Sequence, residues 1–174
     1  GATAINTQPQ DRNICATGNA VFSVAVAGSG LSFRWQESTD GGNTWENVNN
    51  GGIYSGATTP NFTIAGVPVS MHNYNYRVLV NGSCENTISD TITLGVRSSG
   101  TWLGAVDTNW HVAGNWCGGV PVSTTDVLVP DWAPVMPTIS DATGTAFFHS
   151  LAIEAAAKLT INGGRVDEAA YGSA

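Results

Sequence analysis

The chain has 174 residues, which allows one mid-sized domain or two small ones and excludes a large multi-domain enzyme. Only 11% of the residues are charged and the formal net charge is -7, so no basic surface for nucleic acid or anionic lipid is expected. The longest apolar runs, such as residues 20–27, are far shorter than the roughly 20 residues that cross a bilayer, which predicts no membrane insertion. The opening residues do not form a signal peptide, so we expect either a removed signal or a fragment.

The first half of the sequence predicts an all-β domain. Short alternating or β-branched segments recur between turn signals, and no long stretch has the apolar period of a helix. A hairpin is expected at Asp40-Gly41-Gly42-Asn43, because the glycines allow the positive φ of a tight turn. About seven strands at this spacing are typical of a β-sandwich. The clearest strands are predicted at residues 21–26, 31–36, 61–65, 74–80 and 91–96.

A second module is expected after a short polar linker at residues 98–100. Three of the six tryptophans fall between residues 102 and 116, and four of the seven prolines fall between residues 121 and 137. These prolines favour strand fragments and fixed turns over helix. Strands are predicted at residues 126–129, 151–153 and 158–164, with a helical turn at residues 155–157 as the alternative. Residues 165–174 show no assignable pattern.

Five segments of the first half carry a family resemblance: Asn13-Ile14-Cys15-Ala16-Thr17-Gly18, Leu31-Ser32-Phe33-Arg34-Trp35-Gln36, Ser38-Thr39-Asp40-Gly41-Gly42-Asn43-Thr44-Trp45, Tyr54-Ser55-Gly56-Ala57 and Tyr76-Arg77-Val78. On these segments, residues 1–97 resemble the immunoglobulin-like modules found in tandem in secreted surface proteins of Bacteroidetes. The resemblance implies that Trp35 is the core tryptophan of strand C and that Tyr76 is the tyrosine near the start of strand F. It also implies extracellular display.

The cysteines of this first module depart from the usual immunoglobulin pattern. The positions of the usual inter-sheet disulfide, near Phe22 and at Val78, are apolar. Modules of the resembled kind commonly carry one cysteine before strand B and another after strand F, which implies a structural disulfide between Cys15 and Cys84. The alternative is two separate, partly buried thiols.

Four segments of the second half carry a further resemblance: Thr101-Trp102-Leu103-Gly104, Asp107-Thr108-Asn109-Trp110, Asn115-Trp116-Cys117-Gly118-Gly119-Val120-Pro121 and Asp126-Val127-Leu128-Val129-Pro130. On these segments, residues 101–174 resemble a Trp-rich β module of the kind that precedes repetitive β regions in such secreted proteins. The resemblance implies that a β-solenoid could begin here. Relatives often have a second cysteine where this chain has residues 147–149, so we expect Cys117 to be a buried, slowly reacting free thiol.

No catalytic pattern is present in the sequence. The close carboxylate pairs lie next to turns, where acids are ordinarily solvated or bonded to local backbone. The three histidines lack metal-binding spacing, and a Gly-x-Ser-x-Gly elbow is absent. We therefore expect a noncatalytic chain without a metal centre. The residues considered were Glu37 with Asp40, Asp126 with Asp131, and His72, His111 and His149.

Two binding hypotheses concern the second module. Asp107-Thr108-Asn109 places two oxygen side chains two residues apart, so calcium is a candidate ligand and an Asx-turn is the alternative. Trp102, Trp110 and Trp116 could stack on glycan rings or contact a partner if they were exposed. The preferred interpretation is that these three tryptophans form the small core of the module.

These observations predict an immunoglobulin-like β-sandwich at residues 1–97 followed by a second small β module at residues 101–174. The expected function is a noncatalytic structural or adhesive module of a secreted bacterial cell-surface protein. Its expected partners are other domains of the same or neighbouring surface proteins, with glycans or self-assembly as further options. The alternative function is a carbohydrate-binding accessory module of a secreted enzyme.

Overall fold

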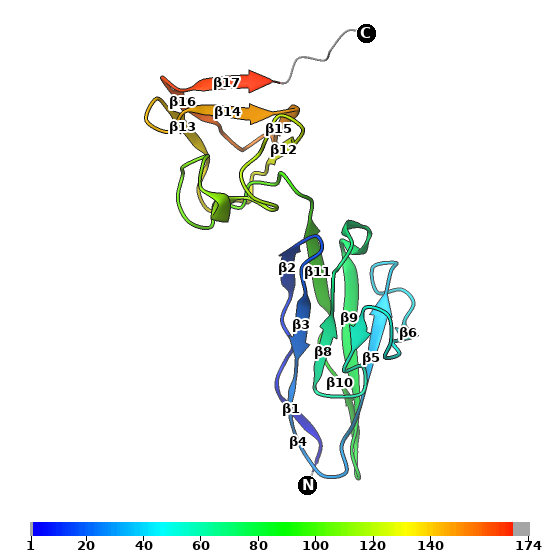
Figure 1. Cartoon of the computed structure of the whole chain (residues 1–174). Coiled ribbons are helices and arrows are strands. Elements are labelled where there is room, and N and C mark those ends of the chain that lie inside the picture. Colours follow the sequence, from blue (N-terminus) through cyan, green and yellow to red (C-terminus); the bar gives the residue numbers. More distant parts are fainter. Residues whose placement is uncertain (1, 169–174) are drawn as a thin grey trace. The chain divides into compact units, whose positions relative to one another are not determined.

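The computed structural model describes residues 2–168 and divides the chain into two compact units, Gly1–Arg97 and Ser98–Ala174. Figure 1 shows that strands dominate both units. Two short 3₁₀ helices, η1 (Val69–Met71) and η2 (Ala113–Asn115), interrupt the strands. In the described part of the chain, no helix combines the length and the apolar character that a membrane crossing requires.

The first unit is built from short strands separated by tight turns. Strands β1, β2, β7 and β10 are short and largely exposed, so apolar alternation does not mark them in the sequence. The strands are β1 (Ala4–Thr7), β2 (Arg12–Cys15), β3 (Ala20–Ser23), β4 (Ala25–Ala27), β5 (Ser32–Ser38), β6 (Glu46–Asn47), β7 (Tyr54–Ser55), β8 (Asn61–Ile64), β9 (Tyr74–Asn81), β10 (Asn86–Ile88) and β11 (Ile92–Arg97).

These strands form an immunoglobulin-like β-sandwich. One sheet has the order β2-β11-β9-β5-β6, with β10 paired to β9, and the other has the order β3-β8-β7. β1 pairs with β4. β2 runs parallel to β11, whereas the β11–β9, β9–β5 and β3–β8 pairs are antiparallel. This arrangement confirms the predicted fold class.

An aromatic cluster fills the space between the two sheets. Trp35 and Tyr76 are fully buried, Trp35 stacks on Phe62 with ring centroids 5.4 Å apart, and Tyr76 stacks on Phe22 at the same separation. The Trp35 indole N–H donates to the Thr59 carbonyl at 2.9 Å, so its polar atom is satisfied inside the core. Packing of these rings replaces the usual inter-sheet disulfide.

The hairpin predicted at residues 40–43 joins β5 to β6. Gly41 and Gly42 have φ values of 75° and 91°, which an L side chain would adopt only with strain. The Asp40 carboxylate accepts the backbone N–H of Thr44 at 2.9 Å, and the hydroxyls of Thr44 and Ser38 at 2.7 Å each. These hydrogen bonds, with the Thr44 N–H contributing most, lower the pKa of Asp40 to about 2.

The second unit repeats a three-strand pattern. Its strands are β12 (Asp126–Val129), β13 (Thr138–Ser140), β14 (Thr145–Phe148), β15 (Ser150–Ile153), β16 (Thr160–Asn162) and β17 (Arg165–Glu168). β12 pairs with β15, β13 with β16 and β14 with β17, all in parallel. We call β12, β13 and β14 the first coil and β15, β16 and β17 the second coil (Figure 1).

The structure decides two points that the sequence left open in this region. Residues 155–157 form a turn and its exit, not the helical turn that was the alternative, because three alanines are too few to nucleate a helix. Residues 165–168, to which no pattern was assigned, form β17. The sequence alone does not show which side chains of β17 face the inside of the unit. The parallel register of β17 with β14 determines this. The remaining residues of that stretch, 169–174, lie outside the described part of the chain.

Candidate interaction site

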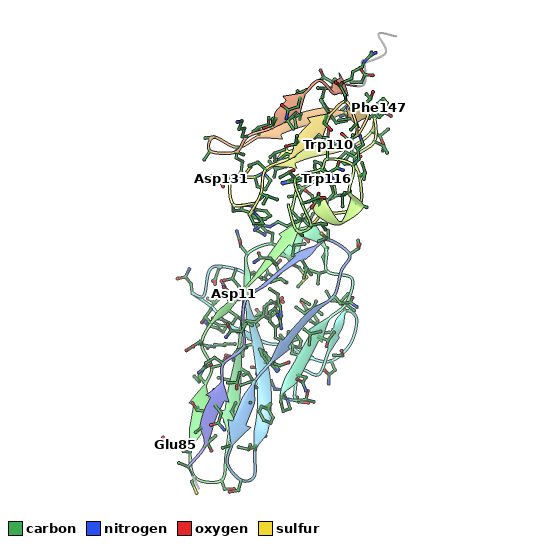
Figure 2. The ribbon with its side chains drawn as sticks, turned by 90° about the vertical axis from the view of Figure 1, so that its left-hand side faces the viewer. Asp11, Glu85, Trp110, Trp116, Asp131 and Phe147 are labelled. Atoms are coloured by element: carbon green, nitrogen blue, oxygen red, sulfur yellow. The ribbon has the colours of Figure 1, made fainter. Side chains whose placement is uncertain are left out.

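The three clustered tryptophans form the core of the second unit. Trp102 and Trp110 are fully buried and Trp116 is 3% exposed. The Trp116 ring meets Trp102 and Trp110 edge to face, with centroids 4.9 and 4.6 Å apart and interplanar angles of 77° and 67°. Figure 2 shows Trp110 and Trp116 inside this unit. Buried, steeply inclined rings cannot stack on a glycan, so the hypothesis of glycan or partner contact through these residues is wrong.

The segment that carries the tryptophans covers one end of the first coil, and we call residues 101–116 the cap segment. Its Trp102 N–H donates to Leu128 of β12 at 2.8 Å, and its Trp110 N–H donates to Thr138 of β13 at 3.1 Å. The His111 ring nitrogen Nε2 lies 3.0 Å from the Thr145 carbonyl of β14. All three strands of the first coil are therefore bonded to the cap segment.

Asn115 organises the cap segment, a role that was not assigned from the sequence. Its fully buried amide NH₂ donates to the Asp107 carboxylate at 2.8 Å and to the Asn109 carbonyl at 3.0 Å. Its amide oxygen accepts the backbone N–H groups of Val106 and Asp107 at 2.8 and 3.2 Å. The sequence signal for this role is an asparagine next to Trp116. The side-chain amide of asparagine both donates and accepts hydrogen bonds, so one asparagine can pair with several backbone groups at once.

The proposed calcium ligands are also used within the cap segment. The Asp107 carboxylate accepts the Asn109 N–H at 2.9 Å, and the Asn109 side chain accepts the His111 N–H at 2.9 Å. Both are Asx-turns, the alternative considered for this motif. No group of three or more potential metal ligands occurs among residues 2–168.

The second coil exposes the face that corresponds to the buried face of the first coil. In the first coil, Val127, Ile139 and Ala146 are buried. Their parallel neighbours in the second coil are Leu151, Ile161 and Val166. Ile161 is 47% exposed, and Ile153, the neighbour of buried Val129, is 43% exposed. We call this end of the unit, formed by β15, β16 and β17, the open face.

The carboxylates considered for catalysis take part in structural hydrogen bonds or are solvated. Asp126 accepts the Ser150 hydroxyl at 2.6 Å and lies 2.7 Å from His149 Nδ1, and these two partners, Ser150 more strongly, lower its pKa. Asp131 is exposed at the surface of the second unit (Figure 2). In the first unit, Asp40 is held by its own hairpin.

Glu37 binds two tyrosines at the edge of the sandwich core. Its carboxylate accepts the hydroxyls of Tyr54 at 2.8 Å and Tyr76 at 2.5 Å. Glu37 and Tyr76 are directly opposite each other on β5 and β9, which aligns the pair. Burial, followed by the hydrogen bond to Glu37 and then its charge, raises the pKa of both tyrosines far above the usual range. Tyr76 thus ties β9 to a side chain of β5. In the usual tyrosine corner, the tyrosine hydroxyl instead binds a backbone group.

This cluster predicts alkaline destabilisation of the first unit. The unfolded chain releases tyrosine protons near pH 10, whereas the folded chain retains them at Tyr54 and Tyr76. The contribution of these tyrosines to the free energy of unfolding should therefore be constant between pH 7 and about 9 and fall as the pH rises above about 10. Urea titrations between pH 7 and 11 measure this slope. Replacing both tyrosines by phenylalanine should flatten it, whereas Tyr74→Phe, on the same strand, should not; equal slopes in all variants would contradict the prediction.

The predicted Cys15–Cys84 disulfide is wrong. Cys84 is a free, exposed cysteine, whereas Cys15 and Cys117 are each disulfide-bonded. The expected free thiol at Cys117 is also wrong, because Cys117 is disulfide-bonded. Cys15 pairs with Arg97 at one end of β11, whereas Cys84 follows β9 at the opposite end of the same sheet. Strand β9 spans roughly 25 Å, far more than the roughly 7 Å that a disulfide allows between Cα atoms.

Two family models match the chain. The domain of unknown function DUF8696 matches residues 4–98, which is more than half of the chain, and DUF8693 matches residues 101–166. The strand order of the first unit defines its class as an immunoglobulin-like sandwich. The chain belongs to the DUF8696 family. No curated protein matches it.

Solved immunoglobulin structures are similar to part of the chain. The tandem Ig repeats of Dlar share 16% identity at a TM-score of 0.48, covering 56% of this chain and 49% of that one. The titin M3 domain shares 13% identity at a TM-score of 0.44, covering 55% of this chain and 96% of that one. The N-terminal Ig1-2 module of Drosophila DLAR shares 17% identity at a TM-score of 0.45, covering 58% and 54%. This chain spans about half the length of the Dlar repeats.

Proposed function

We propose that the chain is a noncatalytic structural or adhesive module of a secreted bacterial cell-surface protein, and that it works by contact with other proteins. The observation that carries this proposal is the open face. Apolar side chains gathered at one end of a module, such as Ile153 and Ile161, are typical of a site that another protein covers. The motif resemblance to Bacteroidetes surface proteins supports the same setting.

Two further features support secretion and argue against the alternative function. The disulfide-bonded cysteines favour an oxidising compartment outside the cytosol. A carbohydrate-binding module would need exposed aromatic rings, and the three tryptophans suggested for that role are buried. Protein contact is therefore the preferred function over glycan binding.

The free cysteine offers a direct test of location. In cells that produce the protein, a membrane-impermeant maleimide should label Cys84 without lysis, because this thiol is exposed. Cys15 and Cys117 should react only after reduction and denaturation. Cys84→Ser is the control and should abolish the native label. Labelling that requires lysis, or three thiols that react without reduction, would overturn the extracellular assignment.

Binding to cell surfaces tests the contact itself. Purified chain should bind to intact bacterial cells and lose that binding when the cells are first treated with protease. Ile161→Asp should weaken binding at least about tenfold, because a charge on the open face would be buried without a partner. Val122→Asp changes an exposed valine of the same unit outside the open face and should have no effect. Retention on cellulose or chitin, with no dependence on Ile161, would favour the carbohydrate-binding alternative.

A further inference from the structure

We propose that the outer face of the larger sheet in the first unit binds an extended, acidic segment of another protein through Arg34 and Arg77. The bound segment carries carboxylates at two alternate positions. This inference goes beyond the proposed function, because it names a second contact surface, on the other unit, and the chemistry of its partner.

Strand alternation places the two arginines on the face of the sheet that points away from the core. Trp35 and Val78 are fully buried and lie directly opposite each other on the neighbouring strands β5 and β9 (Figure 1). Because successive side chains of a strand point to opposite faces, Arg34 and Arg77 project from the other face, where both are partly exposed. We call the outer-face residues Arg34, Gln36, Asn47, Arg77, Leu79 and Ile88 the arginine face.

The register of the sheet sets the distance between the two arginines. Arg34 pairs with Leu79 and Gln36 pairs with Arg77, so the arginines are diagonal neighbours on adjacent strands. Diagonal positions on antiparallel strands lie about 7–8 Å apart. Alternate residues of an extended chain lie about 7 Å apart, because each residue advances about 3.3–3.4 Å. Two carboxylates on one side of an extended segment therefore match the two guanidinium groups.

Both guanidinium groups have donors available for a carboxylate. Arg77 Nε donates to the Gln36 amide oxygen at 2.9 Å. One terminal nitrogen of Arg34 donates to the Val48 carbonyl and to the Asn49 amide oxygen, each at 3.4 Å. The salt bridges among residues 2–168 involve neither arginine. A guanidinium has five N–H donors and binds a carboxylate through two of them, so each arginine can accept this ligand without breaking an ion pair of the chain.

Arg77 is held in place by an aromatic ring and an amide. Its guanidinium carbon lies 4.1 Å from the centroid of the Trp45 ring, which is a cation–π contact. The Trp45 indole N–H donates to the Gly42 carbonyl at 3.0 Å, which fixes the ring on the hairpin. Gln36, the hydrogen-bond partner of Arg77, donates to the Asn47 amide oxygen at 3.0 Å. An arginine ordered in this way loses less side-chain entropy when it binds a partner.

The acids of β5 and β6 lie away from the arginine face. Glu37 and Glu46 pair directly with each other, one position out of step with the arginine-face residues of these strands. Both therefore belong to the opposite side of the sheet, where Glu37 binds the two tyrosine hydroxyls. The arginine face is thus locally positive on a chain with a formal net charge of -7, which makes it complementary to a short acidic segment.

An apolar row beside the arginines favours a polypeptide as the partner. Leu79, opposite Arg34, pairs on its other side with Ile88 of β10, and Ile88 is 52% exposed. A peptide can place an aliphatic side chain on this row while its carboxylates bind the arginines. An acidic polysaccharide has no aliphatic side chain to offer. The expected partner segment therefore has two acids at alternate positions followed by an apolar residue.

A synthetic peptide tests the proposal on the intact chain. The probe is acetyl-Thr-Glu-Thr-Glu-Thr-Leu-Thr-amide, titrated into isotope-labelled protein and followed by nuclear magnetic resonance. The Arg77 Nε–H and Trp45 indole N–H signals should shift saturably. Arg34→Gln and Arg77→Gln should each raise the Kd about tenfold or more, because each removes a charged hydrogen-bond partner. Arg12→Gln is the matched control and should leave the Kd unchanged, because Arg12 lies on β2 and donates to the Val21 carbonyl of β3.

Three further probes define the chemistry of the partner. The peptide with glutamine in place of both glutamates should not bind, and a peptide with adjacent glutamates should bind about threefold or more weakly, because only one carboxylate then faces the sheet. An unchanged Trp35 indole signal shows that each variant is folded. No shift with the first peptide, or equal affinity for the glutamine peptide, overturns the proposal. Tighter binding of an oligogalacturonate that depends on Arg34 and Arg77 overturns the assignment to a protein partner. None of these readouts involves Ile161, so binding through the open face succeeds or fails separately.

Discussion

Asn115→Ala should lower the free energy of unfolding of the second unit by about 3–5 kcal/mol. The substitution removes four hydrogen bonds made by one fully buried side chain. It leaves the N–H groups of Val106 and Asp107 and the carbonyl of Asn109 without that partner. Each buried group left unsatisfied costs about 1–3 kcal/mol, and water recovers part of this here because Val106 and Asp107 are themselves exposed. Urea unfolding followed by tryptophan fluorescence measures the change.

Asn162→Ala is the matched control for this prediction. Asn162 lies in the same unit with an exposed side chain, so its removal should change stability by less than about 0.5 kcal/mol. Asn115→Asp tests the hydrogen bonds separately from side-chain volume, because it keeps the size but removes the NH₂ donor opposite Asp107. A loss below about 1 kcal/mol for Asn115→Ala would show that the cap segment folds without this network.

Trp116→Ala should destabilise the second unit by about 4 kcal/mol or more. Truncating a buried tryptophan to alanine typically costs about 3–5 kcal/mol, and each aromatic pair adds about 0.5–1.5 kcal/mol. Trp116 contacts both of the other core tryptophans edge to face. The free energy of unfolding of a small unit is only a few kcal/mol. In this variant the backbone amides of β12, β13 and β14 should therefore lose their protection from hydrogen exchange at room temperature.

A pair of phenylalanine variants separates ring packing from hydrogen bonding. The Trp116 indole N–H donates to the Trp110 carbonyl at 2.7 Å, whereas the buried Trp110 indole N–H has no partner among the described residues. Trp116→Phe should therefore cost about 1–2 kcal/mol more than Trp110→Phe. Equal losses in chemical denaturation would mean that the Trp116 hydrogen bond makes no net contribution.

Local patterns in the sequence predicted the sandwich because its strands alternate strongly. The alternation on β9 buries Tyr76, Val78 and Val80, and Trp35 lies opposite Val78 on β5. The glycines after Asp40 likewise specify the hairpin through a local requirement for positive φ. For these elements, neighbours in sequence carry enough information to define the structure.

Features set by distant residues could not be predicted in the same way. The parallel pairing of β14 with β17 joins residues twenty positions apart, and β17 itself has the mixed sequence Arg-Val-Asp-Glu. The Cys15 assignment failed because the end of the sheet at which a cysteine lies depends on strand order. Asn115 was overlooked because its role depends on the backbone groups that the folded loop directs toward it.

The shortness of two outermost strands of the sandwich, β6 and β7, has a consequence for solubility. β6 and β7 each end a sheet and contain only two residues, Glu46–Asn47 and Tyr54–Ser55. An edge this short offers too few backbone groups to nucleate intermolecular sheet growth, and the charge and amide of β6 oppose it further. Many copies of this module can therefore be held close together without forming amyloid-like aggregates through β6 and β7.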